Sequence, residues 1–317
     1  GQGVEDAIRY STQFNQGSAR TVAMGNAFTA LGGDLGAITI NPATTALYNC
    51  GEFSITPSIT WNMDDIGFMP SSGVYRPAVS SGLKRKFSIP NVAFAYSLPT
   101  GLDRGLVSYS FGFALNKVND FNHCYSFIEY DMGSSFLGSI ASGLSGVSQA
   151  DIDATDAYNN FDIPWKSLLA WDTYLIDKCG EPGFDYIGAT ENIYTDDAGY
   201  TTISTGNLNK DFLRETSGNV YNLAMNFGLN ISDRFYAGAN LNVFTVAYRE
   251  NMTYGESAVY NEFQTGFREM QYNYNQETEG SGANVQLGFI WIPFSLLRIG
   301  ATYTTPTLYE LADSWGE

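Results

Sequence analysis

Hydrophobic and polar residues alternate in seven stretches of the chain. In residues 220–231 the odd positions carry large apolar side chains, from Tyr221 to Ile231, and the even positions carry mostly Asn and small residues. Successive side chains of a β-strand point to opposite faces of its sheet, so this pattern predicts a strand with one apolar and one polar face. Six further stretches have the same period, the last of them less regularly: residues 53–61, 92–98, 107–115, 283–291, 297–303 and 235–248.

Two properties of these stretches favour an all-β, antiparallel transmembrane β-barrel over a β-sandwich, whose strands also alternate. The polar positions carry Asn, Ser, Thr and Gly rather than the charged residues of a solvated surface. Outer-membrane barrels also have short turns at one end and long loops at the other. The predicted connections follow this order, with short ones at residues 99–104, 232–233 and 293–295 and long ones at residues 63–86, 117–216 and 255–264.

The composition agrees with a membrane barrel. Charged residues make up 15% of the chain, against about 25% in ordinary soluble domains. Aromatic residues also make up 15%, yet no run of about 18 apolar residues exists, which excludes a helical membrane span. A closed barrel is the remaining way for a chain to cross a bilayer.

The net charge of −17 argues against nucleic acid as a partner. The acidic residues are concentrated between Asp120 and Glu215, where sixteen Asp and Glu face four Lys and Arg.

The strand count predicts that the barrel is incomplete. Single-chain bacterial barrels have an even number of strands, and we find seven. The last residues, "LYELADSWGE", contain no further strand by this pattern. We therefore expect an amino-terminal portion of a longer barrel; a strand overlooked within residues 117–216 is the alternative.

The stretch "TVAMGNAFTALGGDLGAITINPAT" (residues 21–44) is rich in glycine and precedes the first strand. It is not a phosphate-binding loop, because Gly32, Gly33 and Gly36 fit neither the Gly-x-Gly-x-x-Gly nor the Gly-Lys-Ser/Thr pattern, and no Lys follows them. A buried helix from Ala19 to Leu31, ended by the two glycines, is a second interpretation.

The arrangement resembles the long-chain fatty-acid transporter family (FadL/TodX type), in the form common among Bacteroidetes-like bacteria. The resemblance is carried by "SARTVAMGNAFTALGGDLGAITINPA" (18–43), with "EDAIRYS" (5–11) before it and "EFSITPS" (52–58) after it. The later stretches "GSGANVQLGFIWIP" and "LLRIGATYTTPTLYEL" also match, and only residues 117–216 match weakly.

The resemblance implies a fourteen-stranded barrel in the bacterial outer membrane, with the signal peptide already removed. It divides the chain into a hatch that fills the lumen (1–48), strands one to three (49–116), an extracellular insertion (117–216) and strands four to seven (217–317). The implied function is passive uptake of small hydrophobic compounds, such as long-chain fatty acids or aromatics, with lipids as partners and no cofactor. A related barrel type implies an alternative, a scaffold or shuttle for surface-exported proteins in type IX secretion. The residues expected to bind the ligand or gate the lumen are Met24, Phe28, Leu31, Leu35, Asn41, Pro42 and Ala43; a purely structural role is the alternative.

Helical patterns occur within the insertion. Residues 164–175 place Leu168, Trp171 and Leu175 on one stripe, with Trp165 nearby, and residues 136–147 are small and apolar. These helices form either a core of their own or an apolar groove in which those four side chains capture a ligand.

The remaining candidates are single residues. Gly112 is expected to kink its strand and open the wall sideways. Cys124 and Cys179 are a possible disulfide pair. The single histidine, His123, is expected in a loop with no catalytic role, and we predict no enzyme activity. The stretch "DIDATD" (151–156) lacks the Gly and distant Glu of a calcium loop, and we predict no metal site.

Overall fold

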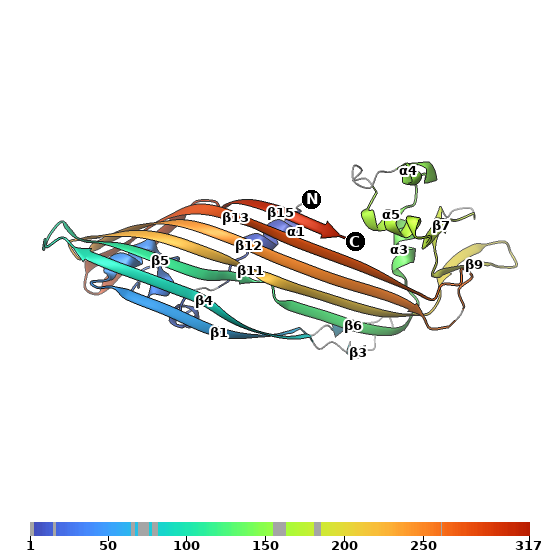
Figure 1. Cartoon of the computed structure of the whole chain (residues 1–317), viewed down its shortest axis with the longest axis horizontal. Helices are drawn as coiled ribbons and strands as arrows, with labels where there is room; N and C mark the ends of the chain where they lie inside the picture. The colour runs from blue at the N-terminus through green and yellow to red at the C-terminus, as the bar shows by residue number, and fades with distance from the viewer. Residues whose placement is uncertain are drawn as a thin grey trace.

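A large antiparallel sheet forms most of the molecule (Figure 1). The computed structural model describes residues 3–14, 17–64, 67–68, 76–77, 82–154, 163–180, 185–260 and 262–317. Neighbours in the sheet follow the order β1-β4-β5-β11-β12-β13-β14, while β6 pairs with β11 and β15 pairs with β13. Every pairing is antiparallel, so the chain runs up and down across the sheet.

The seven predicted strands are confirmed, and most of them are longer than predicted. The pattern captured only the part of each strand in which apolar side chains dominate one face. The sheet strands are β1 (Glu52–Asp64), β4 (Gly82–Pro99), β5 (Leu106–Asp120), β6 (His123–Met132), β11 (Leu208–Ile231), β12 (Phe235–Ala258), β13 (Glu269–Phe294), β14 (Leu297–Thr304) and β15 (Leu308–Gly316).

Within the described residues, these nine strands occupy seven positions, because two positions are interrupted. Strand β6 continues beyond β5 along β11, and β15 continues beyond β14 along β13. The prediction that residues 308–317 contain no strand is therefore wrong. His123 also begins a strand rather than lying in a loop.

The predicted bounds of the insertion are too wide. Strand residues enter the range 117–216 from both sides, so the segment outside the main sheet is residues 133–207. It contains α3 (Phe136–Gly143), α4 (Gln149–Asp153), α5 (Trp165–Asp172), and two small sheets, β7 (Ile176–Lys178) with β8 (Tyr186–Gly188) and β9 (Glu191–Thr195) with β10 (Thr201–Thr205). The "DIDATD" stretch lies partly here, but its last two residues are outside the described residues. A third small pair, β2 (Gly67–Phe68) with β3 (Arg76–Pro77), lies between β1 and β4.

The amino-terminal part has little regular structure. It contains α1 (Val4–Ser11), α2 (Ala19–Ala23) and the 3₁₀ turns η1 (Leu35–Ala37) and η2 (Pro42–Leu47). The alternative of a helix from Ala19 to Leu31 is wrong. Gly25 and Asn26 both have a φ of 61°, a left-handed conformation that ends the helix after one turn.

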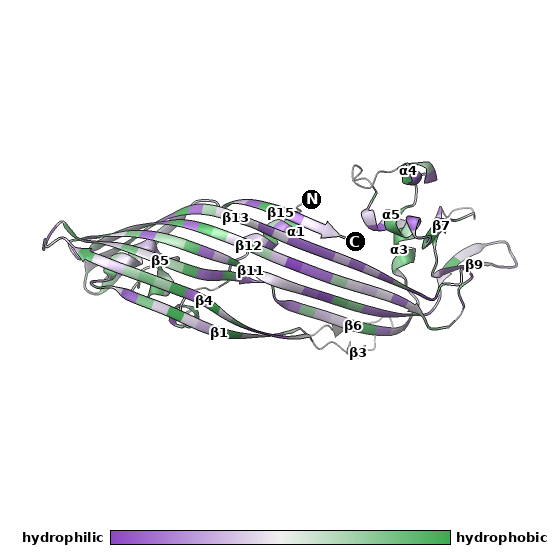
Figure 2. Cartoon of the chain, viewed as in Figure 1, coloured by the Kyte–Doolittle hydropathy of each residue, from purple (hydrophilic) through white to green (hydrophobic). Residues whose placement is uncertain are grey.

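The two faces of the sheet differ in chemistry. We call the face that carries Asn226, Asn240 and Gln286 the inner face and the opposite one the outer face. On β11 the outer side chains from Tyr221 to Ile231 are apolar, whereas further towards Leu208 the strand becomes polar. Figure 2 shows the same change along the neighbouring strands, from mixed green and white at one end to purple at the other.

Short turns join the strands at the apolar end. The turn between β11 and β12 contains Ser232 and Asp233, with φ angles of 57° and 55°, as a tight hairpin requires. The long connections lie at the other end, as predicted. None of the helices among the described residues has the length and apolarity that a membrane crossing needs.

Candidate functional site

The amino-terminal segment, residues 17–48, lies on the inner face at the apolar end of the sheet. Asn240 Nδ2 donates to Ile38 O at 2.9 Å, Gln286 Nε2 to Thr39 O at 3.0 Å, and Asn226 Nδ2 to Pro42 O at 2.9 Å. The uncharged polar face found in the sequence therefore has a structural explanation. Its amides supply hydrogen bonds to a backbone that lacks a regular partner strand.

Glycines on the inner face make room for this segment. A Cβ atom on Gly238 would lie 2.3 Å from Pro42 O, and one on Gly288 would lie 2.2 Å from Asn41 Oδ1. A Cβ on Gly300 would lie 2.3 Å from Thr29 O. Only glycine allows backbone to approach a sheet this closely.

Hydrogen bonds of the Asn-Pro-Ala tripeptide fix the segment to the sheet. The Asn41 side chain accepts from Ala43 N at 3.0 Å and donates to Phe289 O at 3.0 Å. Pro42 begins η2, where its missing N–H costs nothing. Five of the seven residues predicted to bind or gate are buried, and Met24 and Leu31 are exposed: the buried ones are Phe28, Leu35, Asn41, Pro42 and Ala43.

Helix α1 lies further along the inner face. Tyr10 is buried, with its ring centroid 6.1 Å from that of Phe121 and 6.0 Å from that of Tyr248, both edge-on. The Arg9 guanidinium lies 4.5 Å above the Tyr248 ring. Asn119 Nδ2 donates to Arg9 O and so fixes the end of the helix to β5. The alternation of apolar and polar residues ends before this part of the strands, so the sequence pattern does not predict this cluster.

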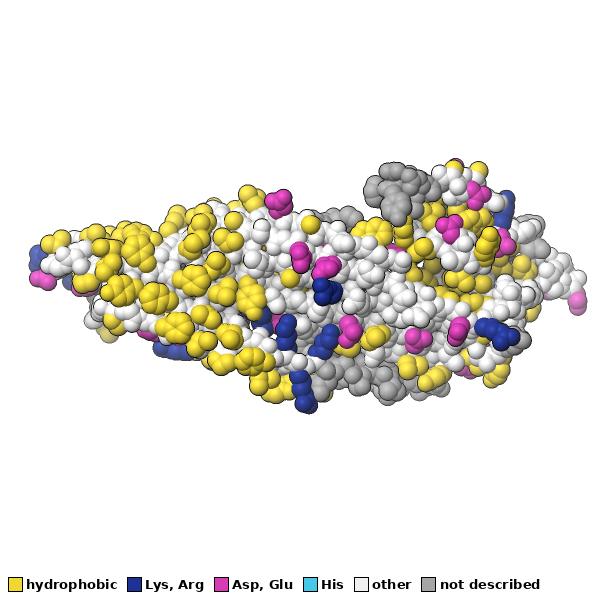
Figure 3. Space-filling model, viewed as in Figure 1, with side chains coloured by type: hydrophobic (Ala, Val, Ile, Leu, Met, Phe, Trp, Pro, Cys, Tyr) yellow, Lys and Arg dark blue, Asp and Glu magenta, His cyan; other side chains and the backbone are white. Residues whose placement is uncertain are grey.

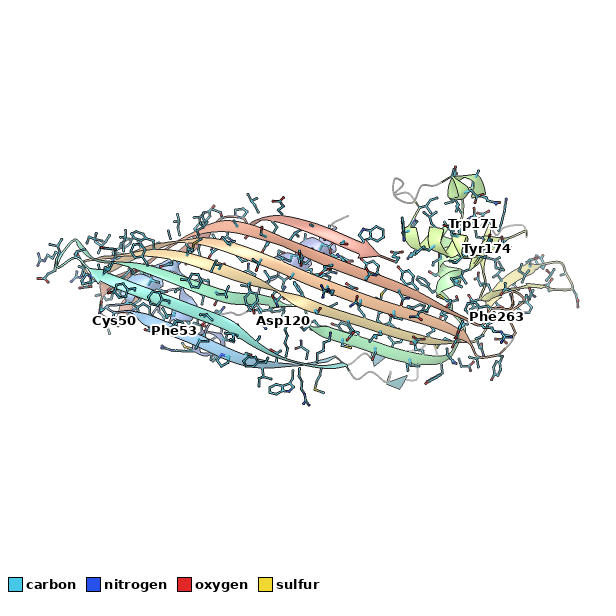
Figure 4. All side chains as sticks on the ribbon, in the orientation of Figure 1. Cys50, Phe53, Asp120, Trp171, Tyr174 and Phe263 are labelled. Carbon is cyan, nitrogen blue, oxygen red and sulfur yellow. The ribbon has the colours of Figure 1, made fainter. Side chains whose placement is uncertain are left out.

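The third strand position of the sheet, which β5 and β6 share, is interrupted next to α1. Residues 121 and 122 separate β5 from β6, and Phe121 N bonds to Gly218 O across the interruption. Figure 4 shows Asp120 at this point. The predicted kink at Gly112 is wrong, because Gly112 pairs regularly with Ala95 and Asn226, and its close contact is with Thr45 of the amino-terminal segment.

Beside the interruption, the backbone ladder between β4 and its neighbour ends. Strand β4 pairs with β5 from Asn91 to Pro99, but in the described residues its half from 82 to 90 pairs with β1 alone. Both strands are irregular here: the β1–β4 register shifts between Thr56 and Ser58, and the β5–β11 register shifts at Val118. Bulges bend a strand and increase its local twist. We call the boundary between β4 residues 82–90 and residues 117–125 the seam.

A hollow of about 290 Å³ lies on the inner side of the interruption. Charged pairs surround it. Arg214 donates to Glu250 through Nε at 2.7 Å and Nη2 at 3.1 Å, and Lys117 lies 2.6 Å from Asp120. The hollow is lined by Arg9, Thr12, Phe14, Asn119, Asp120, Phe121, His123, Tyr125, Arg214, Thr216 and Tyr248.

A second hollow, of about 430 Å³, shares Arg9 and Arg214 with the first and extends along α1 to Glu250 and Tyr274. The two hollows flank a surface that combines aromatic rings with guanidinium groups. Both guanidinium groups are already paired with carboxylates, Arg9 with Asp6 at 2.8 Å and Arg214 with Glu250 at 2.7 Å.

The insertion has its own core. Leu168 is buried in it with Ile140 and Ile152, and Trp171 and Leu175, which are partly buried, pack against it. Three of the four predicted capture residues therefore contribute to this core. Trp165 points elsewhere: its ring centroid lies 5.4 Å from that of Trp315 at the end of β15.

A buried carboxylate joins the insertion to the sheet. Glu256 on β12 is 1% exposed and accepts from Phe136 N at 2.8 Å and Ser135 Oγ at 2.9 Å, at the start of α3. Tyr254 adds a hydrogen bond from its hydroxyl group at 2.6 Å. The insertion is thereby held against the polar ends of β11, β12 and β13.

The predicted disulfide between Cys124 and Cys179 is wrong. All three cysteines lie in the described part of the chain, and none is in a disulfide. Cys124 lies on β6, opposite Glu215 of β11, whereas Cys179 is buried in the insertion after β7. The two residues belong to different units, which sequence separation alone could not reveal.

Comparisons of the chain with models of protein families, with curated proteins and with solved structures give no match. The described residues define the class of protein: a mostly antiparallel β-sheet protein whose amino-terminal segment packs on one face of the sheet.

Proposed function

We propose that the chain is a FadL/TodX-type protein of the bacterial outer membrane that takes up small hydrophobic compounds passively. In this proposal the sheet is part of a closed β-barrel, the inner face lines its lumen, and the amino-terminal segment is the hatch. Long-chain fatty acids and apolar aromatic molecules are the substrates that this arrangement favours.

The observation that carries the proposal is that the same strands have an exposed apolar outer face and a polar inner face. The outer face exposes large apolar side chains, among them Phe94, Phe111, Phe227 and Leu241, each between 40% and 49% exposed. These side chains gather over the end of the sheet that has short turns (Figure 3). The apolar part of β11, residues 221–231, has about the length of a transmembrane strand. A soluble protein rarely exposes an apolar surface of this extent.

The inner face supports a route for an apolar molecule. The amino-terminal segment fills the end of the sheet that has short turns, and the two hollows beside α1 lie above it. A molecule that reaches the hollows is next to the seam, where the wall has no backbone ladder. Lateral release through the seam keeps an apolar chain out of water, which its free energy of transfer favours.

Uptake of radiolabelled oleate tests this function. The chain would be expressed in the outer membrane of a bacterium that lacks its own fatty-acid uptake protein, with an empty vector as control. We expect oleate uptake and growth on oleate to exceed the control by about tenfold or more, and uptake of a water-soluble sugar to stay unchanged. Equal oleate uptake with and without the protein would refute the proposal.

A second function, a scaffold or shuttle for exported proteins, is favoured by the insertion. Residues 133–207 contain eleven Asp and Glu against two Lys. Tyr174, 90% exposed and at a φ of 58°, projects from the end of α5 (Figure 4). Exposed aromatic residues are enriched in protein-binding surfaces.

Affinity capture from outer-membrane extracts separates the two functions. If the shuttle function holds, surface-exported proteins are recovered with the parent chain and lost with a variant in which residues 139–203 are replaced by a short Gly-Ser linker. If oleate is taken up and no exported protein is recovered, the transport function is supported and the shuttle function is refuted.

A further inference from the structure

The seam is closed by side chains alone. Lys86 Nζ donates to Asn122 Oδ1 at 3.1 Å, and Lys84 Nζ donates to Thr216 O at 3.1 Å, reaching β11 past the interruption. From the other side, Lys117 Nζ donates to Ser88 Oγ at 3.1 Å. Three flexible ammonium groups therefore stand where the rest of the wall has a backbone ladder.

The acceptors of these lysines are unequal. Lys117 also has a carboxylate, Asp120, at 2.6 Å. Lys84 has Glu215 at 3.6 Å, but the Glu215 side chain is 46% exposed, and water weakens such a pair. Among the described residues, the only acceptor of Lys86 is the neutral amide oxygen of Asn122.

A carboxylate is a stronger acceptor for an ammonium group than an amide or a carbonyl oxygen. An anionic head group that reaches the seam from the hollow can therefore replace Asn122 and Thr216 as the partner of the two lysines. The surroundings also suit the rest of an amphipathic molecule, because Phe87 and Ile89 alternate with the lysines on β4 and are 65% and 39% exposed on the outer face.

The outer surface also carries positive charge. Lys and Arg side chains gather at the lower middle of the view in Figure 3, where the apolar region ends. In a chain with 16 Lys and Arg against 33 Asp and Glu, positive charge at the border of an apolar surface is a local exception.

We propose that Lys84 and Lys86 form a carboxylate site in the seam, and that an amphipathic carboxylate bound there opens the wall. The lysines hold the seam closed through Asn122 and Thr216, and they release these acceptors when the ligand's carboxylate takes their place. The alkyl chain then passes outward between β4 and β6, along Phe87 and Ile89. This inference rests on the proposed uptake function and adds its trigger.

Distance measurements between two spin labels test the opening. Labels at Trp61→Cys on β1 and Ile128→Cys on β6 lie on the outer face on opposite sides of the seam, and β1 moves with β4 because the two are paired. The full chain carries the labels in detergent, with Cys50 and Cys124 changed to Ser and Cys179 to Ala. Oleate is the probe, and oleyl alcohol, with the same chain and no carboxylate, is its control.

We expect oleate to lengthen the distance between the labels by roughly one strand spacing, about 5 Å, and oleyl alcohol to leave it unchanged. In the double variant K84Q/K86Q, the longer distance is expected without ligand, oleate adds nothing, and oleate affinity falls roughly tenfold. The variant Arg85→Gln removes a positive charge between the two lysines whose side chain faces the outer side, and it should behave as the parent.

The possible outcomes separate the trigger from the function. Uptake of oleate without any change in distance, or an equal change with oleyl alcohol, overturns the trigger and leaves the uptake function standing. The trigger is also overturned if oleate lengthens the distance in K84Q/K86Q as it does in the parent. If the parent chain binds neither compound, the trigger and the uptake function both fail.

Discussion

At the scale of single residues, the inner face is organised by what the amino-terminal segment requires. Amide side chains stand where its carbonyl groups need donors, and glycines stand where its backbone touches the strands. Asn226 and Gly228, two residues apart on β11, show both requirements: one donates to Pro42 O, and a Cβ on the other would lie 3.1 Å from the backbone Ala46 N.

The glycines give the first prediction. Gly288→Ala places a methyl group against Asn41 and Pro42, and overpacking of this kind typically costs about 1–3 kcal/mol. We expect a lower midpoint of unfolding in urea and faster proteolysis of the amino-terminal segment. Gly133→Ala is the control, because its added methyl group meets nothing within 4 Å, and its midpoint should change little.

The ion pairs beside the hollows give the second prediction. Arg214→Met leaves Glu250, whose side chain is 7% exposed, without its bidentate partner. Arg214 is partly exposed, so we expect a loss of roughly 1–3 kcal/mol, less than for a fully buried pair. The free energy of unfolding, from urea titration, measures it.

The neighbouring pair of Arg249 and Glu277 is the matched control. Their side chains are 60% and 46% exposed, so Arg249→Met should change the free energy by no more than about 0.5 kcal/mol. Equal losses in the two variants would contradict the role assigned to Arg214.

At the scale of elements, the sequence predicted the strands well and their extent poorly. Period-two alternation identified residues 220–231 because one face there is apolar. It did not identify residues 208–219 of the same strand, where Arg214 and Lys210 face inward and polar residues face outward. Once both faces are polar, alternation carries no signal.

The seam and the hollows could not be predicted for a related reason. The bulge at Val118 inserts one residue into the β5–β11 register, so Asn119 takes an inward position that the alternation does not give it. The lysines of the seam meet Asn122 and Thr216, which are 36 and 132 residues away from their donors. The Asn-Pro-Ala stretch was predicted from the family resemblance, and its local geometry agrees with the preference for Asn and Pro at a helix start.

The link between the insertion and the sheet gives the third prediction. Glu256→Ala removes the acceptor for Phe136 N and Ser135 Oγ at the start of α3, leaving donors in a buried environment. Such a loss costs about 1–3 kcal/mol, which corresponds to at least fivefold more frequent opening of the insertion. Limited proteolysis within residues 133–207 measures it. Glu269→Gln, at an exposed carboxylate on β13, should be cleaved at the parent rate.

At the scale of the whole molecule, the boundary between the apolar and polar halves of the outer face runs across every long strand. On β11 it falls near Tyr221, and on β12 near Thr245, its partner in the register. A boundary at matching heights on paired strands defines a belt rather than scattered patches. We therefore expect the molecule to require detergent or lipid for solubility.

The belt gives the fourth prediction. Phe227→Lys places a charge in the middle of the outer apolar region, which costs about 2–4 kcal/mol at the centre of a membrane barrel. We expect reduced assembly into lipid vesicles, measured by flotation and resistance to urea extraction. Thr253→Lys, on the outer face of β12 beyond the belt, should assemble like the parent. If both variants assembled equally well, the proposed membrane placement would be wrong.

The length of the central strands has a consequence for where encounter and release take place. Strand β11 has 24 residues, about 80 Å at 3.3 Å per residue, of which a bilayer occupies about ten. With a tilt of about 45°, the proposed membrane placement sets the insertion some 30 Å above the lipid head groups. A ligand would then first contact the protein far from the bilayer, and it would travel along the inner face to reach the level of the membrane.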